Sequence, residues 1–384
     1  MSYSKGVKLK NKKVALLTYH ASHNMGSILQ TYAMLNLLKS GMNLDVSLIN
    51  YSSQGQKDQY SLYSRRKNIK SIIKNVLIFL FKEVFEKRRN DFIMSIDRLF
   101  TQKVDGIDGV DDFERISTRY DYLVTGGDQI WNRSCPDFND IYFLPFSSTA
   151  KKVSYAPSFG GRSIFNKNEN LELYRNCLKD YDSLSIRERN GQRWIEDLTG
   201  IEAKIVADPT LMVNKSIFYE LANRKVSLDK YIFFYGVPFD RSFFSAVDYI
   251  SKKYDLPVVV LDPKIWIFGF GFVRGFKLAE ESTPEMYLSL IKNAEFVITT
   301  SFHGSIFSQI FKKKFWYLTF RGTNNDDDRL KCLFDQMGIN DRVIFTNEVN
   351  NVDFLKPIDS DKIDLNLQKL IFESQEYLKK AFEN

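Results

Sequence analysis

The chain of 384 residues has few of the side chains that build disulfide scaffolds and metal centres, with three cysteines and three histidines. Cys135, Cys177 and Cys332 are far apart, odd in number and without a CxxC spacing, so the sequence indicates neither a disulfide framework nor a zinc site. The acidic run 326–328 lacks calcium-loop spacing, and we expect it to cap the following helix. We therefore expect no metal, no cofactor and a reducing, cytoplasmic setting.

Several nucleotide-binding and hydrolase motifs are also missing from the sequence. It contains no GxxxxGK[ST], no GxGxxG and no GxSxG, so a P-loop, a dinucleotide-binding fold and an α/β-hydrolase elbow are unsupported. The basic stretch 1–13 is followed by an apolar run, 14–17, that is too short for a signal-peptide core. These absences leave a globular protein without an export signal.

Short apolar segments alternate with helical patterns along the chain, and its length favours two domains. Such alternation predicts mostly parallel sheets covered by helices. The expected strands are 14–17, 44–49, 122–125, 153–155, 184–186, 204–207, 231–235, 257–261 and 296–299. We therefore expect an α/β protein with Rossmann-like domains over residues 1–212 and 213–350, and a helical tail over 351–384 that packs back on them.

The net charge of +7 is concentrated in one segment, residues 65–90. Nine basic and two acidic residues lie there, and nine minus two equals the excess of the whole chain. Apolar residues between 69 and 84 fall on one helical face, but the uncharged run is much shorter than the roughly 20 residues that span a bilayer. Two interpretations remain open: a helix that docks on an anionic membrane surface, and an ordinary domain-packing helix. No nucleic-acid partner is expected, because the sequence has no RNP, helix-turn-helix or zinc signature.

A loop with polar residues follows the first strand. It contains His20, His23, Asn24, Gly26 and Gln30. Gly26 permits a close approach of the backbone, and the helix N-terminus behind it favours a negative or hydroxyl-rich ligand. The alternative is a purely structural turn.

A second polar loop follows the strand 122–125. It supplies Gly127, Asp128, Gln129, Trp131 and Asn132. Sugar sites need this mixture, since hydroxyl groups require paired donors and acceptors while C–H faces stack on aromatic rings. The alternative is a local turn with Trp131 in the core.

A strand-end arginine, Arg187, offers a guanidinium that can clamp a carboxylate or phosphate in a bidentate fork. A salt-bridged surface residue is the alternative. Arg329 directly follows the acidic run 326–328, and we expect it to face the same ligand cleft as Arg187.

A histidine lies at the turn from the strand 296–299 into the next helix. His303 is surrounded by Ser301, Phe302, Gly304 and Ser305. Imidazole exchanges protons near neutral pH, and hydroxyl and amide groups at a helix N-terminus bind phosphate oxygens. A structural histidine is the alternative interpretation.

Taken together and in this order, these segments resemble the polysaccharide pyruvyltransferase family. The matching text is KVALLTYHASHNMGSILQTYAMLNLL, YDYLVTGGDQIWN, SYAPSFG, SIRERNG, VADPTLM and FVITTSFHGSIFSQIF. The resemblance implies two Rossmann-like domains facing a cleft, as in GT-B glycosyltransferases, and the transfer of pyruvate from phosphoenolpyruvate to a sugar as a ketal with release of phosphate. It also implies a role in the biosynthesis of capsule or exopolysaccharide, with an acceptor that is a lipid-linked oligosaccharide at the inner face of the cytoplasmic membrane.

The resemblance assigns roles residue by residue. His303 becomes the general acid or the partner of the leaving phosphate, and Arg187 the donor clamp; the two polar N-terminal loops hold the acceptor. Some family members have arginine where this chain has Ser301, and Arg329, Arg321 or Lys292 are the candidates to replace that cation. A nucleotide-sugar-dependent glycosyltransferase of the same architecture is the alternative function.

Overall fold

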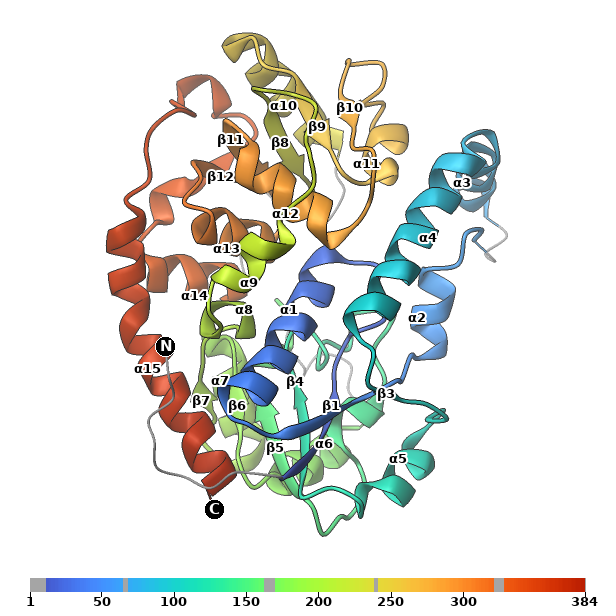
Figure 1. Ribbon diagram of the computed structural model, residues 1–384, viewed down its shortest axis with the longest axis vertical. Coiled ribbons are helices and arrows are strands. Elements are labelled where there is room, and N and C mark those ends of the chain that lie inside the picture. Colours follow the sequence, from blue (N-terminus) through green and yellow to red (C-terminus); the bar gives the residue numbers. More distant parts are fainter. Residues whose placement is uncertain (1–11, 65–67, 162–169, 238–240, 321–327, 384) are drawn as a thin grey trace.

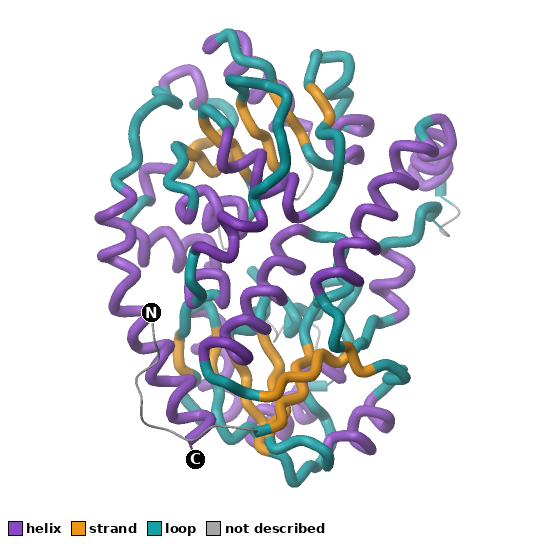
Figure 2. The backbone as a smooth tube through the Cα atoms, viewed as in Figure 1, coloured by secondary structure: helices purple, strands orange, loops and turns teal. Residues whose placement is uncertain are grey.

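The computed structural model describes residues 12–64, 68–161, 170–237, 241–320 and 328–383. Figure 1 shows two groups of strands in opposite halves of the molecule, and Figure 2 shows helices lying around both groups. The first sheet has the order β3-β2-β1-β4-β5 and is parallel throughout. Its strands are β1 (Lys13–Leu17), β2 (Asp45–Ile49), β3 (Lys103–Val104), β4 (Tyr122–Gly126) and β5 (Lys151–Tyr155).

Two short parallel strands extend this half of the molecule beyond β5. They are β6 (Ser185–Ile186) and β7 (Lys204–Ile205), and a bridge from Val153 to Ser183 connects them to the first sheet. The helices of this half are α1 (Met25–Asn36) with a π-helical turn (Leu37–Gly41), α2 (Gln54–Gln59), α3 (Ile69–Leu80), α4 (Lys82–Leu99), α5 (Val110–Ser117), a 3₁₀ turn (Asp140–Phe143), α6 (Leu171–Lys179), α7 (Arg189–Thr199), α8 (Pro209–Met212) and α9 (Ser216–Leu221).

The second sheet has the order β10-β9-β8-β11-β12-β13 and is again parallel. Its strands are β8 (Ile232–Tyr235), β9 (Val258–Val260), β10 (Lys277–Leu278), β11 (Phe296–Thr299), β12 (Phe315–Thr319) and β13 (Val343–Phe345). The helices are α10 (Arg241–Tyr254), α11 (Pro263–Phe268), α12 (Pro284–Asn293), α13 (Phe302–Ile310), α14 (Asp328–Met337), two 3₁₀ turns (Asn340–Arg342 and Val349–Asn351) and α15 (Ser360–Glu383). The α/β fold class expected from the sequence is confirmed.

The strands are apolar without interruption because both faces of each sheet are covered. In β1, Val14 and Leu16 belong to one hydrophobic cluster, whereas Ala15 and Leu17 belong to a second cluster on the other face. Phe233 of β8 belongs to the same cluster as Leu16, although the two residues lie in different sheets. The two halves of the molecule therefore share one continuous core.

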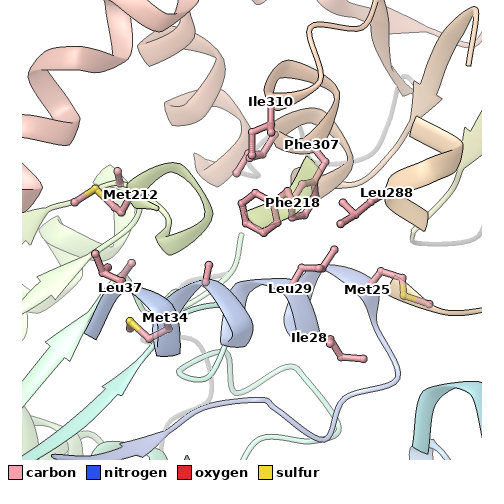
Figure 3. Close-up of a cluster of buried hydrophobic side chains, with 14 of the residues drawn as sticks. Met25, Ile28, Leu29, Met34, Leu37, Met212, Phe218, Leu288, Phe307 and Ile310 are labelled. Carbon is pink, nitrogen blue, oxygen red and sulfur yellow. The ribbon is translucent and has the colours of Figure 1, made fainter. Parts of the chain in front are cut away.

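Helix α1 forms the centre of this shared core. Figure 3 shows Met25 and Leu29 of α1 on the side that faces Phe218 of α9, and Leu288 and Phe307 from the other half. All five side chains are buried, and the rings of Phe218 and Phe307 meet edge to face with centroids 5.1 Å apart. Because α1 begins directly after the first polar loop, this packing fixes the loop against the second sheet.

The C-terminal helix α15 spans both halves. At its start the carbonyl of Ser360 accepts from Gln309 Nε2 at 3.1 Å, and further along the Ser374 hydroxyl accepts from the amide of Ala207 at 2.8 Å. Near its end the carbonyl of Phe382 accepts from the Tyr122 hydroxyl at 2.9 Å. The expected packing of the tail against the body of the protein is therefore observed. None of the described helices has the length and apolar character to cross a membrane.

Candidate functional site

The candidate site is built from the loops that follow β4, β6, β7 and β11. Parallel strands deliver such loops to the carboxyl edge of their sheet, which is where α/β proteins place ligands. Arg187 follows β6, Asp208 follows β7, Asp128 follows β4, and His303 lies in the first turn of α13. All four residues are at most 9% exposed, so they form a nearly buried polar cluster.

The centre of the cluster is the carboxylate of Asp208. Its Oδ2 accepts from Nη1 of Arg187 at 2.7 Å and lies 3.4 Å from Nε2 of His303. Its Oδ1 accepts from the amide of Thr210 at 3.0 Å and from the Thr210 hydroxyl at 2.7 Å. Asp208 thus caps helix α8 with one oxygen and holds the two predicted catalytic residues with the other.

The ionisation of Asp208 follows from these neighbours. Burial by itself would raise the pKa of this carboxyl group, but the adjacent His303 and Arg187 outweigh burial and hold the pKa well below its ordinary value. Asp208 is therefore a carboxylate at neutral pH. Nε2 of His303 is buried and forms no hydrogen bond with a described residue, so the ionised Asp208 acts on the imidazole through its charge at 3.4 Å.

Arg187 is held on several sides but keeps donors unused. Its guanidinium carbon lies 4.1 Å from the ring centroid of Phe302, and Nη2 lies 4.0 Å from Oδ1 of Asp128. Nε and Nη2 are buried, and neither has a hydrogen-bond partner among the described residues. Buried donors without partners are costly. A carboxylate or phosphate oxygen would satisfy them. The salt bridge of the alternative interpretation is present, to Asp208, but Arg187 is buried and is not a surface residue.

The remaining contacts close the cluster into a ring. Asp128 accepts from the hydroxyl of Ser27 in helix α1, and Gly26, the neighbouring residue, packs against His303. A Cβ atom added to Gly26 would lie 2.3 Å from Nδ1 of His303. Gly26 and Asp128, predicted to bind the acceptor, therefore lie beside Arg187 and His303, which were predicted to bind the donor. We call the five residues Gly26, Asp128, Arg187, Asp208 and His303 the charged ring.

The first turn of α13 is more constrained than the sequence predicts. The Ser301 hydroxyl caps the helix by accepting from the amide of Gly304 at 3.3 Å, and the Ser301 carbonyl accepts from the amide of Ser305 at 3.1 Å. Ser301, Gly304 and Ser305, three of the residues predicted to bind phosphate, are thus hydrogen-bonded to one another. The amides of Phe302 and His303 come earlier in the helix, where backbone N–H groups have no intrahelical acceptor.

The residues predicted to supply a second cation near Ser301 lie in different parts of the structure. Arg329 lies in the first turn of α14 and acts electrostatically on the buried Glu188, the residue next to Arg187. Lys292 instead donates to the carbonyl of Ala222 at 3.3 Å, at the end of α12 away from the ring, so it is wrong as a substitute. Arg321 lies outside the described residues, as do 326 and 327 of the acidic run.

In the first polar loop and the start of α1, three predicted ligand residues have structural roles. His20 is fully buried, and its Nε2 lies 2.8 Å from Oδ1 of Asn50. Burial lowers the pKa of His20, so the ring is a neutral core residue. Asn24 caps α1 by accepting from the amide of Gly26 at 2.8 Å. Gln30 is buried and fills the space beside Gly127, whose φ of +67° favours glycine.

His23 lies on the other side of this loop. Its ring stacks between Tyr60 and Phe92, with centroids 4.6 and 5.0 Å away. Burial first, and then the positive charge of Arg88, lower the pKa of His23 to about 3. His23 is therefore neutral, and it faces helix α4 and not the charged ring.

In the second polar loop, the prediction for Trp131 is wrong. The indole is fully buried, stacks on Phe143 with centroids 5.0 Å apart and donates to the carbonyl of Tyr142 at 3.0 Å. It packs in the core and has no free face for a sugar. Gln129 and Asn132 are partly exposed and bind each other at 2.7 Å, which leaves them near Gly160 at the rim of the loop.

Sequence reasoning missed two buried acids near the ring. Burial raises the pKa of Glu188 to about 7, although Arg187 and Arg329 oppose that rise. Burial likewise raises the pKa of Asp137 to about 6. Asp208 was also missed, but it had a usable signal: an acid before proline directly after a predicted strand indicates a capped helix start at the carboxyl edge of a sheet. Among the described residues, no group of histidine, cysteine and acidic side chains forms a metal site.

A family model described as polysaccharide pyruvyl transferase matches residues 24–320. The match spans more than half of the chain and includes Arg187, Asp208 and His303. The chain belongs to the polysaccharide pyruvyl transferase family. The predicted family is thereby confirmed, and with it a transferase that acts on polysaccharides. No curated protein matches the chain.

Several solved structures are similar to this chain at very low sequence identity. The S. aureus MnaA–UDP structure is 9% identical, with a TM-score of 0.50 over 97% of this chain and 91% of that one. Methanocaldococcus jannaschii UDP-GlcNAc 2-epimerase, in complex with UDP-GlcNAc and UDP, is 12% identical, with a TM-score of 0.49 over 95% and 94%. The E. coli ADP-heptose LPS heptosyltransferase II is 8% identical, with a TM-score of 0.44 over 94% and 99%. The S. aureus structure, at a TM-score of 0.50, shows that the polysaccharide pyruvyl transferase chain has the GT-B-like fold predicted for it.

Proposed function

We propose that the protein transfers pyruvate from phosphoenolpyruvate to a sugar of a polysaccharide repeat unit, forming a pyruvate ketal and releasing phosphate. The observation that carries the proposal is the pair of unsatisfied, buried donors on Arg187, beside His303 and Asp208. Phosphoenolpyruvate carries a carboxylate and a phosphate, the two groups that a guanidinium binds best.

The proposed reaction needs one proton, one anion clamp and two acceptor hydroxyl groups. Protonation of the methylene carbon makes C2 cation-like, one sugar hydroxyl attacks it, and a second hydroxyl displaces phosphate to close the ketal. His303 serves as general acid or as partner of the leaving phosphate. Asp208 positions the imidazole, in the way that a carboxylate orients a catalytic histidine, and Arg187 stabilises the negative charge of the donor.

The donor phosphate requires more positive charge than Arg187 alone supplies. Ser301 carries no charge and caps α13, so the open amides at the start of that helix and the guanidinium of Arg329 are the proposed further contacts. The effect of Arg329 on the pKa of Glu188 supports its nearness to Arg187. Phe302 contributes its ring, which holds the guanidinium of Arg187 flat against α13.

On the acceptor side we retain Asp128, Gln129 and Asn132. Asp128 accepts from Ser27 and lies near Arg187, so a sugar hydroxyl that replaced the serine contact would lie beside the donor carbon. We further propose that the acceptor is lipid-linked and that the protein works at the inner membrane face in capsule or exopolysaccharide synthesis. The outward apolar side of α3 supports this proposal.

The decisive experiment incubates the protein with phosphoenolpyruvate and a panel of model and lipid-linked glycosides while phosphate and the added pyruvyl mass are followed. We expect acceptor-dependent release of phosphate and a loss of roughly 100-fold or more for His303→Ala. Near-normal phosphate release by that variant would remove the role of His303. Nucleotide release from a sugar nucleotide, with no reaction of phosphoenolpyruvate, would establish the glycosyltransferase alternative in its place.

A further inference from the structure

Helix α3 is amphipathic in an inverted sense. Six of its eight apolar side chains point away from the protein and are 52% to 76% exposed. They are Ile69, Ile72, Ile73, Val76, Phe79 and Leu80. In Figure 1 the helix lies at the outer edge of the molecule, beyond α4. A single exposed apolar residue needs no explanation, but six exposed apolar side chains on one short helix mark a surface that contacts another apolar surface.

The inner side of α3 is polar and firmly attached. Asn75 exchanges hydrogen bonds with the backbone of Ser64, at 2.8 Å to its amide and 3.0 Å to its carbonyl. Ser71 is buried on the same side, and Ile78 packs in a small cluster with Phe85 and Ile267. The helix is therefore held in this orientation, and its outward apolar side is not the result of a loose attachment.

The apolar surface continues onto the second half of the molecule. Phe270, Phe272 and Val273, in the loop after α11, are exposed, and the ring of Phe272 lies 6.1 Å from that of Phe81 between α3 and α4. We call this surface the apolar edge; it comprises the six outward residues of α3 together with Phe270, Phe272 and Val273. Within the described residues nothing else covers it.

A strongly basic pocket lies beside the apolar edge. Four cationic side chains line it, and none of its lining residues is acidic. We call it the basic pocket; its lining residues are His23, Gln59, Tyr60, Ser61, Leu62, Lys74, Ile78, Phe85, Arg88, Arg89 and Lys264. Lys74 and Ile78 also belong to α3, so the pocket and the apolar edge share one helix.

The positive charge of the pocket is only partly compensated. Arg88 is 8% exposed; its Nη2 donates to Asp262 at 2.9 Å, while its Nε has no partner in the described part of the chain. Lys74, Arg89 and Lys264 form no ion pair with any described residue. Burial, followed by the repulsion of Arg88, lowers the pKa of Lys264 to about 8. Crowded cations with an unsatisfied buried donor need an anion from outside.

We propose that the basic pocket binds the phosphate headgroup of an anionic membrane lipid while the apolar edge enters the membrane interface. Free phosphate would need the pocket but not the apolar surface. Face-to-face pairing of two copies would bring two basic pockets together, and like charges would oppose it. A lipid surface satisfies both features, because it offers phosphate and hydrocarbon side by side.

The inference extends the proposed function without requiring it. His23 lines the pocket and lies three residues before Gly26, the residue that packs against His303. Docking would therefore bring a lipid-linked acceptor to the side of the molecule where the loop before α1 connects the basic pocket to the charged ring. Membrane binding is measured without donor or acceptor, whereas phosphate release from soluble glycosides is measured without membranes, so each proposal fails on its own assay.

The test is flotation of the full chain with phosphatidylcholine vesicles, with and without one quarter phosphatidylglycerol. We expect binding to the anionic vesicles, and a loss of about 10- to 30-fold for Lys74→Gln combined with Arg89→Gln. A second variant, Ile73→Gln with Phe79→Gln, should lose binding through the apolar edge. Both variants change exposed or partly exposed side chains, and unchanged melting curves verify that they fold.

Matched controls come from helix α15. Lys369→Gln with Lys380→Gln removes the same charge, and Leu365→Gln with Phe372→Gln removes the same apolar area, all at exposed positions. Both controls should bind like the wild type. Equal flotation of the pocket variant and the wild type would overturn the proposal. Binding of inorganic pyrophosphate with no flotation, or a dimer in light scattering that Phe79→Gln dissociates, would also overturn it.

Discussion

The charged ring and the basic pocket both contain cationic side chains, but the degree to which carboxylates compensate them is opposite. In the ring, Arg187 and His303 face the carboxylates of Asp208 and Asp128 at 2.7 to 4.0 Å. In the pocket, Asp262 pairs with Arg88 at 2.9 Å, and among the described residues no other carboxylate lies within ion-pair distance of the four cations. The ring is fixed before a ligand arrives, as chemistry requires, whereas the pocket keeps a demand for an anion, as docking requires.

The pKa shifts express the same difference. The ring lowers the pKa of Asp208, so this residue contributes stability above the pKa of an unfolded aspartate, and the contribution is lost as the pH falls toward the lowered value. The pocket lowers the pKa of Lys264 to about 8, so between about 8 and the ordinary lysine value the unfolded chain binds more protons and stability rises with pH. The protein thus stabilises the charged form of Asp208 and destabilises the charged form of Lys264.

The largest expected effect is the loss of the ring's central carboxylate. Asp208→Ala would leave Arg187 buried without its partner and remove the cap of α8, so we expect about 3–5 kcal/mol of destabilisation. Urea unfolding at neutral pH measures it. A loss below about 1 kcal/mol would mean that the ring is not a tightly coupled unit, and the contrast with the pocket would disappear.

The buried acid beside the ring gives a pH-dependent effect of intermediate size. Because the pKa of Glu188 is raised to about 7, the folded state binds its proton more tightly, and stability should fall as the pH rises from about 4.5 to about 7. Glu188→Gln should remove this fall, making the variant up to about 3 kcal/mol more stable than the wild type at pH 8. Chemical denaturation at pH 5 and pH 8 tests it. Parallel pH profiles for the two proteins would contradict the prediction.

A smaller effect is expected where α1 touches the ring. Glycine to alanine inside a helix ordinarily stabilises, but a Cβ on Gly26 would collide with the imidazole of His303. Gly26→Ala should therefore lower the free energy of unfolding by about 1–3 kcal/mol. It should also slow phosphate release by more than the unfolded fraction of the variant accounts for. Gly109→Ala is the control, since nothing lies within 4 Å of its added Cβ. Equal behaviour of the two variants would show that the contact with His303 is not tight.

The smallest effect is expected in the pocket. Lys264→Gln removes a charge that Arg88 repels, so the variant should be unchanged or about 1 kcal/mol more stable at pH 7, and the difference should shrink above about pH 8. Thermal unfolding at pH 7 and pH 9 measures it. Marked destabilisation at pH 7 would mean that the pocket is compensated after all, and would remove its contrast with the ring.

For the segment 65–90, each of the two interpretations that the sequence left open describes a different helix of the structure. Of the two alternatives, the packing helix describes α4, where Arg88 pairs with Asp262 and Arg98 with Glu285 of the other half. The exposed apolar helix describes α3, and the helix breaks at Phe81 between them. Residues 65–67 lie outside the described part. Hydrophobic periodicity marked the apolar stripe, but it carries no information on which way the stripe faces.

The site residues divide in a similar way. Arg187 and His303 were predicted as site residues because strand-end loops are visible in the apolar pattern, and the expected strand 296–299 coincides with β11. Asp208 was missed because its partners Arg187 and His303 come from two other loops that are distant in sequence. Trp131 was misassigned because an aromatic residue after a strand has the same local sequence whether it lines a site or fills a core.

The sequence by itself determined the family, the two parallel sheets and the loops that carry polar residues, because strand and helix periods and collinear motifs are local properties of the chain. Only the tertiary structure decided that Gly26 meets His303, that Asp208 joins Arg187 to the imidazole, and that α3 turns its apolar side outward. These facts depend on packing between residues far apart in the chain. The pairing of charges and the direction of a helix face are set by that packing.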